Sequence, residues 1–354
     1  MKIHNLETPA LLLDKQAMLR NMEKMDGILS GTSMALYPHY KSHKCPAIAK
    51  IQLERGAKGI TCAKLGEALD LQAAGVDNIV IANQIVQAEK LPKLASLAHK
   101  CRLTVCVDHA QNVLDLEQAM AQAGDGKLHV LVEYDVGMRR CGVSTHEEFL
   151  ALAKLISAQP HLIFEGIQAY AGQLSHEENA EKRFADVQAI EADVAALKAF
   201  CEQNGVKVRE ICGGSTGFAH EKPKNTVYTQ VQFGSYLFLD RSFLPLALQF
   251  EQALFVETTV LSVKPDRVVV DCGVKTMTMD QYPPYFPAFP EAQLSFSEEH
   301  TTLLVENTDL KPGDKLRYVP GHCCTTINIF DRMYAIEGEE VVDCWQVTSR
   351  GKAQ

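Results

Sequence analysis

The sequence has no run of apolar residues long enough to cross a membrane, and it has no tract of low complexity. Its N-terminus, Met-Lys-Ile-His-Asn-Leu-Glu-Thr-Pro, lacks the apolar core and small-residue cleavage site of a secretory signal. Basic residues are in the minority, because 35 Lys and Arg face 44 Asp and Glu. These absences predict a soluble cytoplasmic protein that binds small molecules and has neither a nucleic-acid nor a membrane partner.

Disulfide bonds are not expected either. The chain has eleven cysteines, an odd number, and no secretory signal accompanies them. Most of them, such as Cys62, Cys106, Cys212 and Cys272, lie in apolar runs. We therefore interpret most cysteines as reduced thiols of the core, and we leave a few open to a metal or redox role.

Eight short apolar runs alternate with segments of helical periodicity through most of the chain. They lie at about 33–38, 58–62, 78–82, 102–107, 128–134, 163–169, 208–213 and 229–233. Near-continuous apolar strands bracketed by helices are typical of a parallel sheet with both faces covered. Eight strands in about 240 residues predict an α/β fold, a (β/α)8 TIM-like barrel over residues 14–250. A doubly wound open sheet is the structural alternative.

The last third of the chain has a different pattern. From about Ala253 onward, Pro and Gly are more frequent and short alternating runs appear, as at 267–272 and 315–319. Such runs predict antiparallel strands with one exposed face. We expect a smaller β domain made of residues 1–13 and 251–354, because an N-terminal strand is easily captured by a C-terminal sheet. Within it, Lys275 is predicted to pair with Asp271.

Residues 36–46 combine two His and two Lys at the end of the first apolar run of the barrel. This arrangement indicates a strand that delivers reactive groups to its C-terminal end. A lysine held there among other cations can have a lowered pKa and form a Schiff base with an aldehyde cofactor. We assign this role to Lys41. The competing interpretation is that Lys41 and Lys44 are solvated loop lysines.

Polar residues follow every one of the eight runs, and in a barrel these strand ends converge on the rim where catalytic loops are found. In chain order they are Lys41 and His43, Lys64, Asn83, Asp108, Arg140, Tyr170, Gly213 to Gly217, and Gln232 to Tyr236. The position of these residues favours a barrel with its active site on this rim.

Two of the strand-end loops are candidates for a phosphate site. Gly213-Gly214-Ser215-Thr216-Gly217 follows the seventh run and Gly234-Ser235-Tyr236 follows the eighth, so backbone N–H groups and hydroxyls can converge on an anion. Either cluster alone is commonly just a tight turn. Together with an aldehyde-binding lysine after the first run, they indicate pyridoxal 5′-phosphate (PLP).

Arg140 and Tyr170 are the remaining candidates for cofactor contacts. A guanidinium that keeps its proton suits a hydrogen bond to the phenolic oxygen of the cofactor, or stacking near its ring. The alternative for Arg140 is a surface Arg–Asp pair. Tyr170 is expected to hydrogen-bond the ring or the substrate, although a tyrosine at a strand end is more often a packing residue.

Several of these motifs together resemble a known family. They are Thr8-Pro9-Ala10, residues 38–44, residues 135–142, Gln168-Ala169-Tyr170, and residues 231–236. Over nearly the whole chain they are similar to the D-threonine aldolase/D-serine dehydratase family, PLP enzymes of the alanine-racemase-like fold type III. The resemblance implies that Lys41 carries the cofactor and that the protein is a homodimer. Tyr37 departs from the family, which usually has Arg at this position.

A metal site is expected in the β domain, at His322-Cys323-Cys324. On an extended chain His322 and Cys324 share a face while Cys323 points away. Imidazole with thiolate suits zinc and leaves positions open for water and substrate. By its spacing alone such a pair is more often structural. The resemblance implies a divalent ion, held by His-x-Asp in the aldolases and by His-x-Cys in the dehydratases. We expect zinc, with manganese or magnesium as alternatives.

The resemblance thus implies a PLP- and metal-dependent lyase that acts on D-3-hydroxy amino acids. The His-x-Cys form favours a D-serine or D-3-hydroxyaspartate dehydratase, and retro-aldol cleavage to glycine and an aldehyde is the first alternative. Both reactions use PLP as an electron sink and differ in which bond at Cα is weakened. Lys41 is the main catalytic residue, and His43 or Lys44 either assists as a base or tunes Lys41. The same scaffold also suits an amino-acid racemase or a non-catalytic PLP-binding protein.

Overall fold

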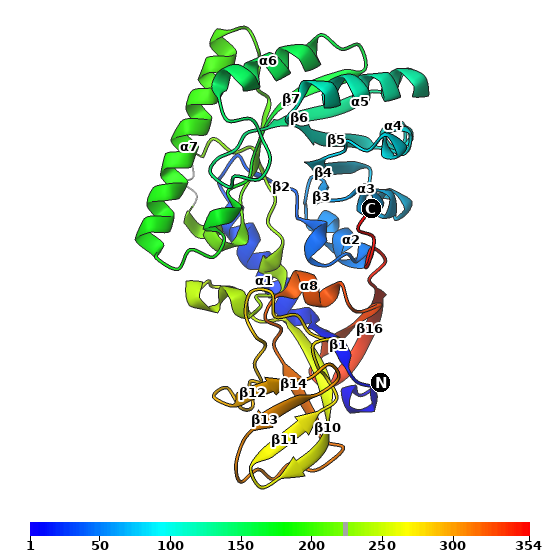
Figure 1. Cartoon of the computed structure of the whole chain (residues 1–354), viewed down its shortest axis with the longest axis vertical. Coiled ribbons are helices and arrows are strands. Elements are labelled where there is room, and N and C mark those ends of the chain that lie inside the picture. Colours follow the sequence, from blue (N-terminus) through cyan, green and yellow to red (C-terminus); the bar gives the residue numbers. More distant parts are fainter. Residues whose placement is uncertain (222–225) are drawn as a thin grey trace. The chain divides into compact units, whose positions relative to one another are not determined.

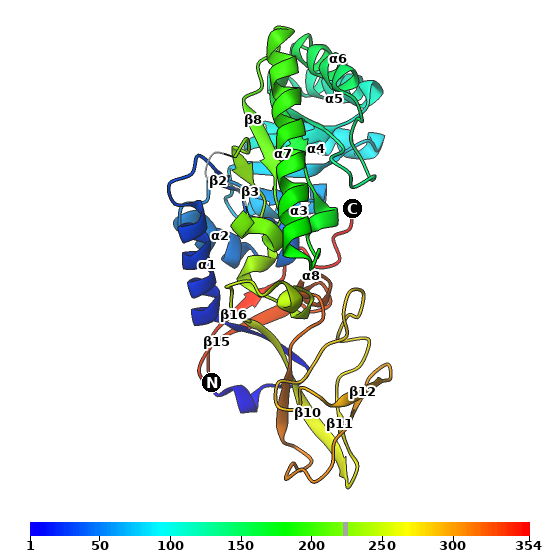
Figure 2. The ribbon, with the colours of Figure 1, turned by 90° about the vertical axis from the view of Figure 1, so that its left-hand side faces the viewer.

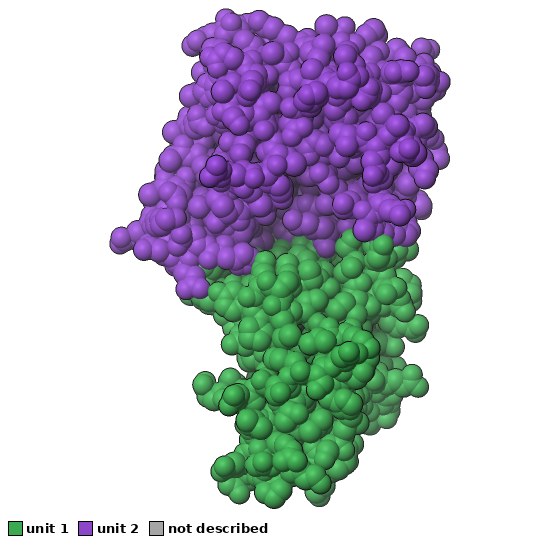
Figure 3. All heavy atoms as spheres, viewed as in Figure 1, with its two compact units in different colours: residues 1–26, 42–47, 235–351 green, residues 27–41, 48–234, 352–354 purple. Residues whose placement is uncertain are grey.

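The computed structural model describes residues 1–221 and 226–354, which form two compact units (Figure 3). The β unit comprises residues 1–26, 42–47 and 235–351, and the barrel unit comprises 27–41, 48–234 and 352–354. The boundaries expected from the sequence, 14–250 for the barrel and 1–13 with 251–354 for the β domain, stay a prediction. No helix within the described residues is both long and apolar enough to span a membrane.

The barrel unit contains a curled, eight-stranded parallel sheet with the order β2-β9-β8-β7-β6-β5-β4-β3. In chain order its strands are β2 (Ala35–Leu36), β3 (Ile60–Cys62), β4 (Asn78–Gln84), β5 (Arg102–Val107), β6 (Leu128–Glu133), β7 (Leu162–Ala169), β8 (Glu210–Gly213) and β9 (Gln230–Val231). Each expected strand is present. The order follows the sequence around the sheet without the reversal of a doubly wound fold, so the predicted α/β, barrel-type fold is confirmed.

The two edge strands of this sheet approach each other. His39, just beyond β2, forms a parallel bridge with Thr61 of β3. The backbone N–H groups of Lys58 and Thr61 donate to the carbonyls of Leu36 and Pro38, both at 3.0 Å. The strand ends that follow β2, β3 and β9 are therefore neighbours on one rim.

Helices follow most of the strands of the barrel unit, and Figure 1 shows α4, α5 and α6 on the outside of β5, β6 and β7. They are α2 (Pro46–Glu54), α3 (Leu65–Ala73), α4 (Leu91–Ala98), α5 (Ala110–Ala123), α6 (His146–Ser157) and α7 (Ala180–Gln203). Figure 2 shows α7, the longest, along its full length. Between β8 and Ala253, the only helices among the described residues are short 3-10 helices. The 3-10 helices of the chain are η1 (Ile3–Asn5), η2 (Tyr40–Ser42), η3 (Ala88–Lys90), η4 (Gly172–Leu174), η5 (Thr216–Glu221), η6 (Ser235–Leu237) and η7 (Arg241–Leu246).

Local sequence determines where these helices begin. α6 starts with a capping box, in which Thr145 Oγ1 accepts from the Glu148 N–H while the Glu148 carboxylate accepts from the Thr145 N–H, both at 3.2 Å. Asn179 caps α7 by accepting from Lys182 N at 3.0 Å. These caps satisfy N–H groups that have no partner inside the helix.

The β unit contains a second eight-stranded sheet with the order β12-β13-β11-β10-β1-β15-β16, and β14 also pairs with β10. Its elements are β1 (Ala10–Asp14), α1 (Lys15–Leu29), β10 (Leu254–Lys264), β11 (Arg267–Val270), β12 (Gln293–Phe296), β13 (Thr301–Leu304), β14 (Lys315–Tyr318), α8 (Cys323–Ile327), β15 (Arg332–Glu337) and β16 (Glu340–Gln346). All pairs are antiparallel except β1 with β15. The mostly antiparallel sheet is as predicted.

The N-terminal strand lies in the interior of this sheet. β1 pairs with β10 on one side and with β15 on the other, and Leu11, Leu12 and Leu13 are completely buried. Burying each leucine contributes about 1.5–3 kcal/mol of transfer free energy. The capture of the N-terminal strand by the C-terminal sheet is thereby confirmed.

One expected ion pair of this unit is wrong. Lys275 pairs with Glu298 at 2.7 Å and with Glu299 at 3.3 Å, whereas the Asp271 carboxylate accepts from the Thr259 N–H at 2.7 Å. The reason is local, because the backbone at Lys275 hydrogen-bonds the carbonyl of Glu298 at 3.1 Å. This contact turns Lys275 toward the 298–299 segment.

Candidate active site

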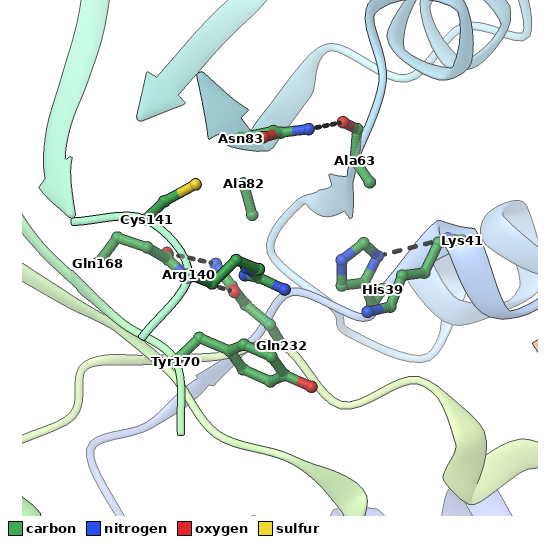
Figure 4. A pocket seen from close by; sticks show the side chains of 10 residues that line it. All are labelled: His39, Lys41, Ala63, Ala82, Asn83, Arg140, Cys141, Gln168, Tyr170 and Gln232. Atoms are coloured by element: carbon green, nitrogen blue, oxygen red, sulfur yellow. Dashed lines mark hydrogen bonds between the residues drawn. The ribbon is translucent and has the colours of Figure 1, made fainter. Parts of the chain in front are cut away.

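A cavity opens at the carboxyl ends of the barrel strands, and its lining comes from the barrel unit (Figure 4). The lining residues are His39, Lys41, Ala63, Ala82, Asn83, Arg140, Cys141, Gln168, Tyr170 and Gln232. They follow or end β2, β3, β4, β6, β7 and β9. The rim on which the sequence placed its strand-end residues is therefore a real cavity, and five of those residues meet there: Lys41, Asn83, Arg140, Tyr170 and Gln232.

The Tyr170 ring, on the wall of the cavity, has two cations near it. Lys41 Nζ and Arg140 Cζ are each 5.6 Å from the centroid of the Tyr170 ring. This distance is within the range of a cation–π contact. Figure 4 shows the Lys41 and Arg140 side chains reaching toward the same ring. Two positive groups at one end of the cavity favour a ligand with negative charge.

The turn that carries Lys41 is tied to two neighbouring strand ends. It lies in the 3-10 turn η2, and its own N–H donates to Nδ1 of His39 at 3.3 Å. The N–H of His39 in turn donates to the Phe233 carbonyl, beyond β9, at 3.0 Å. Two strand ends therefore hold the turn that carries Lys41, and the role of its amine stays a prediction.

Arg140 has a buried partner. Its Nη2 lies 3.8 Å from Oε1 of Glu133, whose other oxygen accepts from Gln84 Nε2 at 2.5 Å. Burial raises the pKa of Glu133, and the Gln84 hydrogen bond and the nearby Arg140 charge oppose that shift. The Asp of the alternative surface pair, Asp135, instead accepts from the backbone N–H groups of Gly137 and Arg139 at 3.0 Å.

Two buried amides, those of Gln168 and Gln232, form another part of the lining. Gln168 Nε2 donates to Gln232 Oε1, and Gln232 Nε2 donates to Gln168 Oε1, both at 3.0 Å. Each amide keeps one N–H and one lone pair beyond this reciprocal pair. Gly213 lies on the intervening strand, where a Cβ atom would come within 2.2 Å of the Ala169 carbonyl oxygen.

The glycine cluster after β8 is explained in part by packing. Gly214 has a φ of +90°, which a side chain rarely adopts, and a Cβ at Gly217 would come within 2.0 Å of the Ser175 carbonyl oxygen. Ser215, Thr216 and Gly217 are buried, and they are not among the lining residues of this cavity in the described chain. Their role in phosphate binding, with that of Gly234 after β9, stays a prediction.

His43, Ser235 and Tyr236 belong to the β unit. His43 is completely buried, and its Nδ1 accepts from the Cys45 N–H at 3.2 Å. The buried ring of Tyr236 packs 6.0 Å from that of Phe250, and the Ser235 carbonyl accepts from the Phe238 N–H at 3.0 Å. The catalytic and cofactor roles expected for these three residues stay predictions.

The candidate metal ligands lie at the start of α8. His322 is extended, but Cys324 is already the second residue of the helix, so the expected extended chain through both is wrong. The two side chains nevertheless interact, because Cys324 raises the pKa of the His322 imidazole. Cys323 is completely buried, and its backbone N–H donates to Asp240 Oδ2 at 2.5 Å. His322 and Cys324 are therefore brought together by the start of a helix and not by an extended chain.

The other ring nitrogen of His322 contacts a carboxylate. Nδ1 lies 2.6 Å from Asp280 Oδ2, and Thr325 Oγ1 donates to Asp280 Oδ1 at 2.9 Å. Burial lowers the pKa of His322, but the hydrogen bond and charge of Cys324, with the Asp280 hydrogen bond, raise it to about 10. Burial also opposes the charged form of Asp280 and so raises its pKa. Hydrogen bonds from His322 and Thr325 outweigh this effect, and the pKa of Asp280 is lowered overall.

This pair suits a zinc ion in its chemistry, since imidazole and thiolate are ligands that zinc prefers. Within the described residues no group of three or more His, Cys, Asp or Glu is arranged around one metal position. A metal held here would therefore take its remaining ligands from water or substrate.

Some lining residues were not assigned from the sequence. His39 stands two residues before Lys41, and Gln168 stands two before Tyr170, so both lay inside motifs that were already singled out. Cys141 directly follows Arg140. Outside the cavity, nothing in the sequence marked Asp280 as a neighbour of His322, because it lies in a loop 42 residues earlier. Only the folded chain identifies it.

Comparison with known proteins gives two matching family models. One, described as "Alanine racemase, N-terminal domain", matches residues 13–242, and the other, described as "Putative serine dehydratase domain", matches residues 253–336. D-threonine aldolase from an Arthrobacter species is 40% identical over 359 residues, which cover 98% of this chain and 93% of that enzyme.

Solved structures agree with these matches. The crystal structure of D-threonine aldolase from Filomicrobium marinum has a TM-score of 0.95 and 34% identity, and the match covers 100% of this chain and 98% of that chain. A D-threo-3-hydroxyaspartate dehydratase, in a cysteine-to-alanine variant described as metal-free, has a TM-score of 0.87 and 23% identity, with 98% of each chain covered. At this lower identity, the second match shows that the two proteins share a fold.

Proposed function

This chain belongs to the D-threonine aldolase/D-serine dehydratase family of PLP-dependent lyases, and on that basis we propose that it cleaves D-3-hydroxy amino acids. The reaction we favour is retro-aldol cleavage, which gives glycine and an aldehyde. The observation that carries the proposal is the cavity in which Lys41, Arg140 and Tyr170 converge at the carboxyl ends of the barrel strands.

Aldol cleavage is favoured over dehydration by similarity. The aldolase relative is 40% identical over 98% of this chain, whereas the dehydratase structure is 23% identical. Dehydration stays the second candidate because of one specific feature, the His322 and Cys324 pair, which is the form that the resemblance assigns to the dehydratases. Racemization and non-catalytic PLP binding are further outcomes for the assay to separate.

The residues of the cavity fit PLP. Lys41 would hold the cofactor through its ε-amine, and the face of Tyr170 lies beside that amine. Arg140 supplies a fixed positive charge at the same end of the cavity, suited to an anionic oxygen of the cofactor or to a substrate carboxylate. When bound, PLP supplies an electron sink for the bond broken at Cα. The Gln168 and Gln232 amides offer one further donor and acceptor each.

We propose that the loops after β8 and β9 contact the phosphate of the cofactor. Gly214, Ser215, Thr216, Gly217 and Gly234 follow adjacent strands β8 and β9, which is where phosphate sites of barrels are commonly found. For Ser235 and Tyr236 the proposal rests on sequence alone. In the dehydration alternative, Lys41 takes the proton from Cα.

A divalent cation is the second group that we propose, with His322 and Cys324 as its protein ligands and zinc as its identity. A cation there would polarise the β-hydroxyl of the substrate. The donor types and the contact between the two side chains support this assignment. The relative whose cysteine variant is described as metal-free gives it further support. We also propose a homodimer, which light scattering on the purified protein would test.

The assay for this function incubates the PLP-loaded protein with D-threonine, D-serine and D-3-hydroxyaspartate, each with and without a chelator, and uses L-threonine as the control. Glycine with acetaldehyde from D-threonine supports the aldolase. Ammonia with a 2-oxo acid, and no glycine, would establish the dehydratase instead. Interconversion of enantiomers without either product would replace both with a racemase, and no turnover of any substrate would contradict the lyase proposal.

A further inference from the structure

We propose that Asp280 is a positioning residue for the metal, which fixes the His322 ring so that Nε2 and the Cys324 thiolate face the same cation. The inference rests on the proposed metal site and adds to it a carboxylate from a distant loop. It is carried by three contacts around the start of α8, all within the β unit.

The first contact determines which nitrogen of His322 is available to a metal. Asp280 Oδ2 lies 2.6 Å from Nδ1 of His322. An ionised carboxylate only accepts hydrogen bonds, so the proton on Nδ1 is kept in place. Nε2 is then the nitrogen whose lone pair would be available to a cation. Carboxylate–imidazole–metal arrangements of this kind fix the orientation of the ring and increase its basicity.

The second contact holds Asp280 itself. Its Oδ1 accepts from Thr325 Oγ1 at 2.9 Å. Thr278 Oγ1 lies 2.7 Å from Thr325 Oγ1 and 2.9 Å from Thr326 Oγ1, which ties the Asp280 loop to α8 a second time. Because both carboxylate oxygens are engaged by residues at the start of α8, Asp280 acts through His322 and is not itself a third ligand.

The third contact fixes the backbone between the two ligands. Asp240, a completely buried carboxylate, accepts from the N–H of Cys323 at 2.5 Å and from the N–H of Ser242 at 3.1 Å. On the far side, Cys324 Sγ lies 3.6 Å from Ser42 Oγ. Asp240 therefore holds the backbone N–H between the two ligands, while the rotation of the imidazole is left to Asp280. Each carboxylate has a separate task.

The decisive variant is Asp280→Asn, with Thr325→Val as the matched control, because Thr325→Val removes the other contact of the same carboxylate and leaves its charge. Zinc affinity of the PLP-loaded protein is measured by competition with a chromophoric chelator. Loss of a carboxylate that orients a ligating histidine weakens metal binding about 10- to 100-fold. We expect this loss in Asp280→Asn and a smaller loss in Thr325→Val, which removes one support of the carboxylate but keeps the carboxylate itself beside His322.

A second readout separates positioning from a general loosening of the fold. Protein saturated with Co²⁺ is expected to keep its sulfur-to-cobalt absorption band in Asp280→Asn and to lose it in Cys324→Ser. The thermal midpoint of the metal-free Asp280→Asn protein is expected to match that of Thr325→Val. If both variants lose affinity and thermal stability equally, Asp280 has a structural role and the inference is wrong.

The remaining outcomes distinguish this inference from the proposed function. If His322→Ala and Cys324→Ser abolish zinc binding while Asp280→Asn binds zinc as tightly as the unaltered protein, the inference alone is overturned. If His322→Ala and Cys324→Ser bind zinc normally, the metal site itself is misplaced and the inference fails with it. Neither result depends on turnover of a substrate.

Discussion

The amine of Lys41 lies 5.6 Å from the centroid of the Tyr170 ring, on the wall of the cavity at the carboxyl ends of the barrel strands. The two residues come from opposite parts of the barrel sequence, one beyond β2 and one beyond β7. A flat aromatic cofactor joined to Lys41 would have the Tyr170 face within reach as a packing surface. Two predictions follow from this pair of residues.

Replacing Lys41 by Arg keeps the positive charge but removes the nucleophilic amine. We expect activity to fall by about three orders of magnitude or more, and borohydride reduction to leave no cofactor on the protein. Lys50→Arg, on the exposed face of α2, is the control and should behave like the unaltered protein. Peptide mapping after reduction is the measurement, and a label on any peptide without Lys41 would contradict the assignment.

Replacing Tyr170 separates its ring from its hydroxyl. Tyr170→Phe keeps the aromatic face toward Lys41 and Arg140, so PLP affinity should change less than about threefold. Tyr170→Ala removes the ring and should weaken PLP binding by about 5- to 30-fold, which corresponds to about 1–2 kcal/mol. Absorbance titration of the apoenzyme with PLP gives both values. An equal loss in the two variants would show that the hydroxyl is the important group.

The reciprocal amide pair of Gln168 and Gln232 is expected to be strongly coupled in stability. Gln168→Leu leaves the buried Gln232 amide without this partner, so the free energy of unfolding should fall by about 1–3 kcal/mol. The double variant Gln168→Leu/Gln232→Leu should lose less than the sum of the two single losses. Urea unfolding of the four proteins measures the coupling. Strict additivity would mean that the two amides do not stabilise each other.

Glu251 predicts a specific pH dependence of stability. Hydrogen bonds from Arg20 and Lys24 lower the pKa of Glu251 to about 2. Because the folded pKa lies below the unfolded one, the stabilisation is complete above the unfolded value of 4.5 and is lost as the pH falls toward 2. The group is partly exposed, so screening keeps its contribution at roughly 1 kcal/mol or less.

The corresponding experiment compares Glu251→Gln with the unaltered protein by calorimetry between pH 5 and about pH 2, the range in which this linkage acts. The thermal midpoint of the unaltered protein should fall more steeply than that of the variant. Glu23→Gln is the control, because Glu23 is an exposed residue of α1, the helix that carries Arg20 and Lys24. Its thermal midpoint should fall as steeply with pH as that of the unaltered protein. Identical slopes in all three proteins would assign the acid sensitivity to other groups.

Local patterns in the sequence were sufficient for the strands of the barrel and for much of its rim. Near-continuous apolar runs such as 102–107 and 128–133 are typical of strands that are buried on both faces in a parallel sheet. The residue after such a run therefore lies at a strand end. Lys41, Arg140 and Tyr170 were found in this way. Their mutual distance depends on the curvature of the sheet, which no local pattern contains.

The features that were missed depend on contacts between distant segments. The helix start at Cys323 is stabilised by the carboxylate of Asp240, 83 residues earlier, so an extended chain was the natural expectation from residues 320–328 alone. Lys275 is turned toward Glu298 by a backbone hydrogen bond, and no spacing rule predicts that partner. Asp280 meets His322 for the same kind of reason.

The interior position of β1 makes the two ends of the polypeptide depend on each other. Residues 10–14 are synthesised long before one of their neighbours, β15, which begins at residue 332. The β unit therefore cannot complete its sheet until β15 has been made, and contacts between such distant segments form slowly. Removing β15 would uncover one edge of β1 and its buried leucines, so a change near residue 332 would destabilise the strand at residues 10–14.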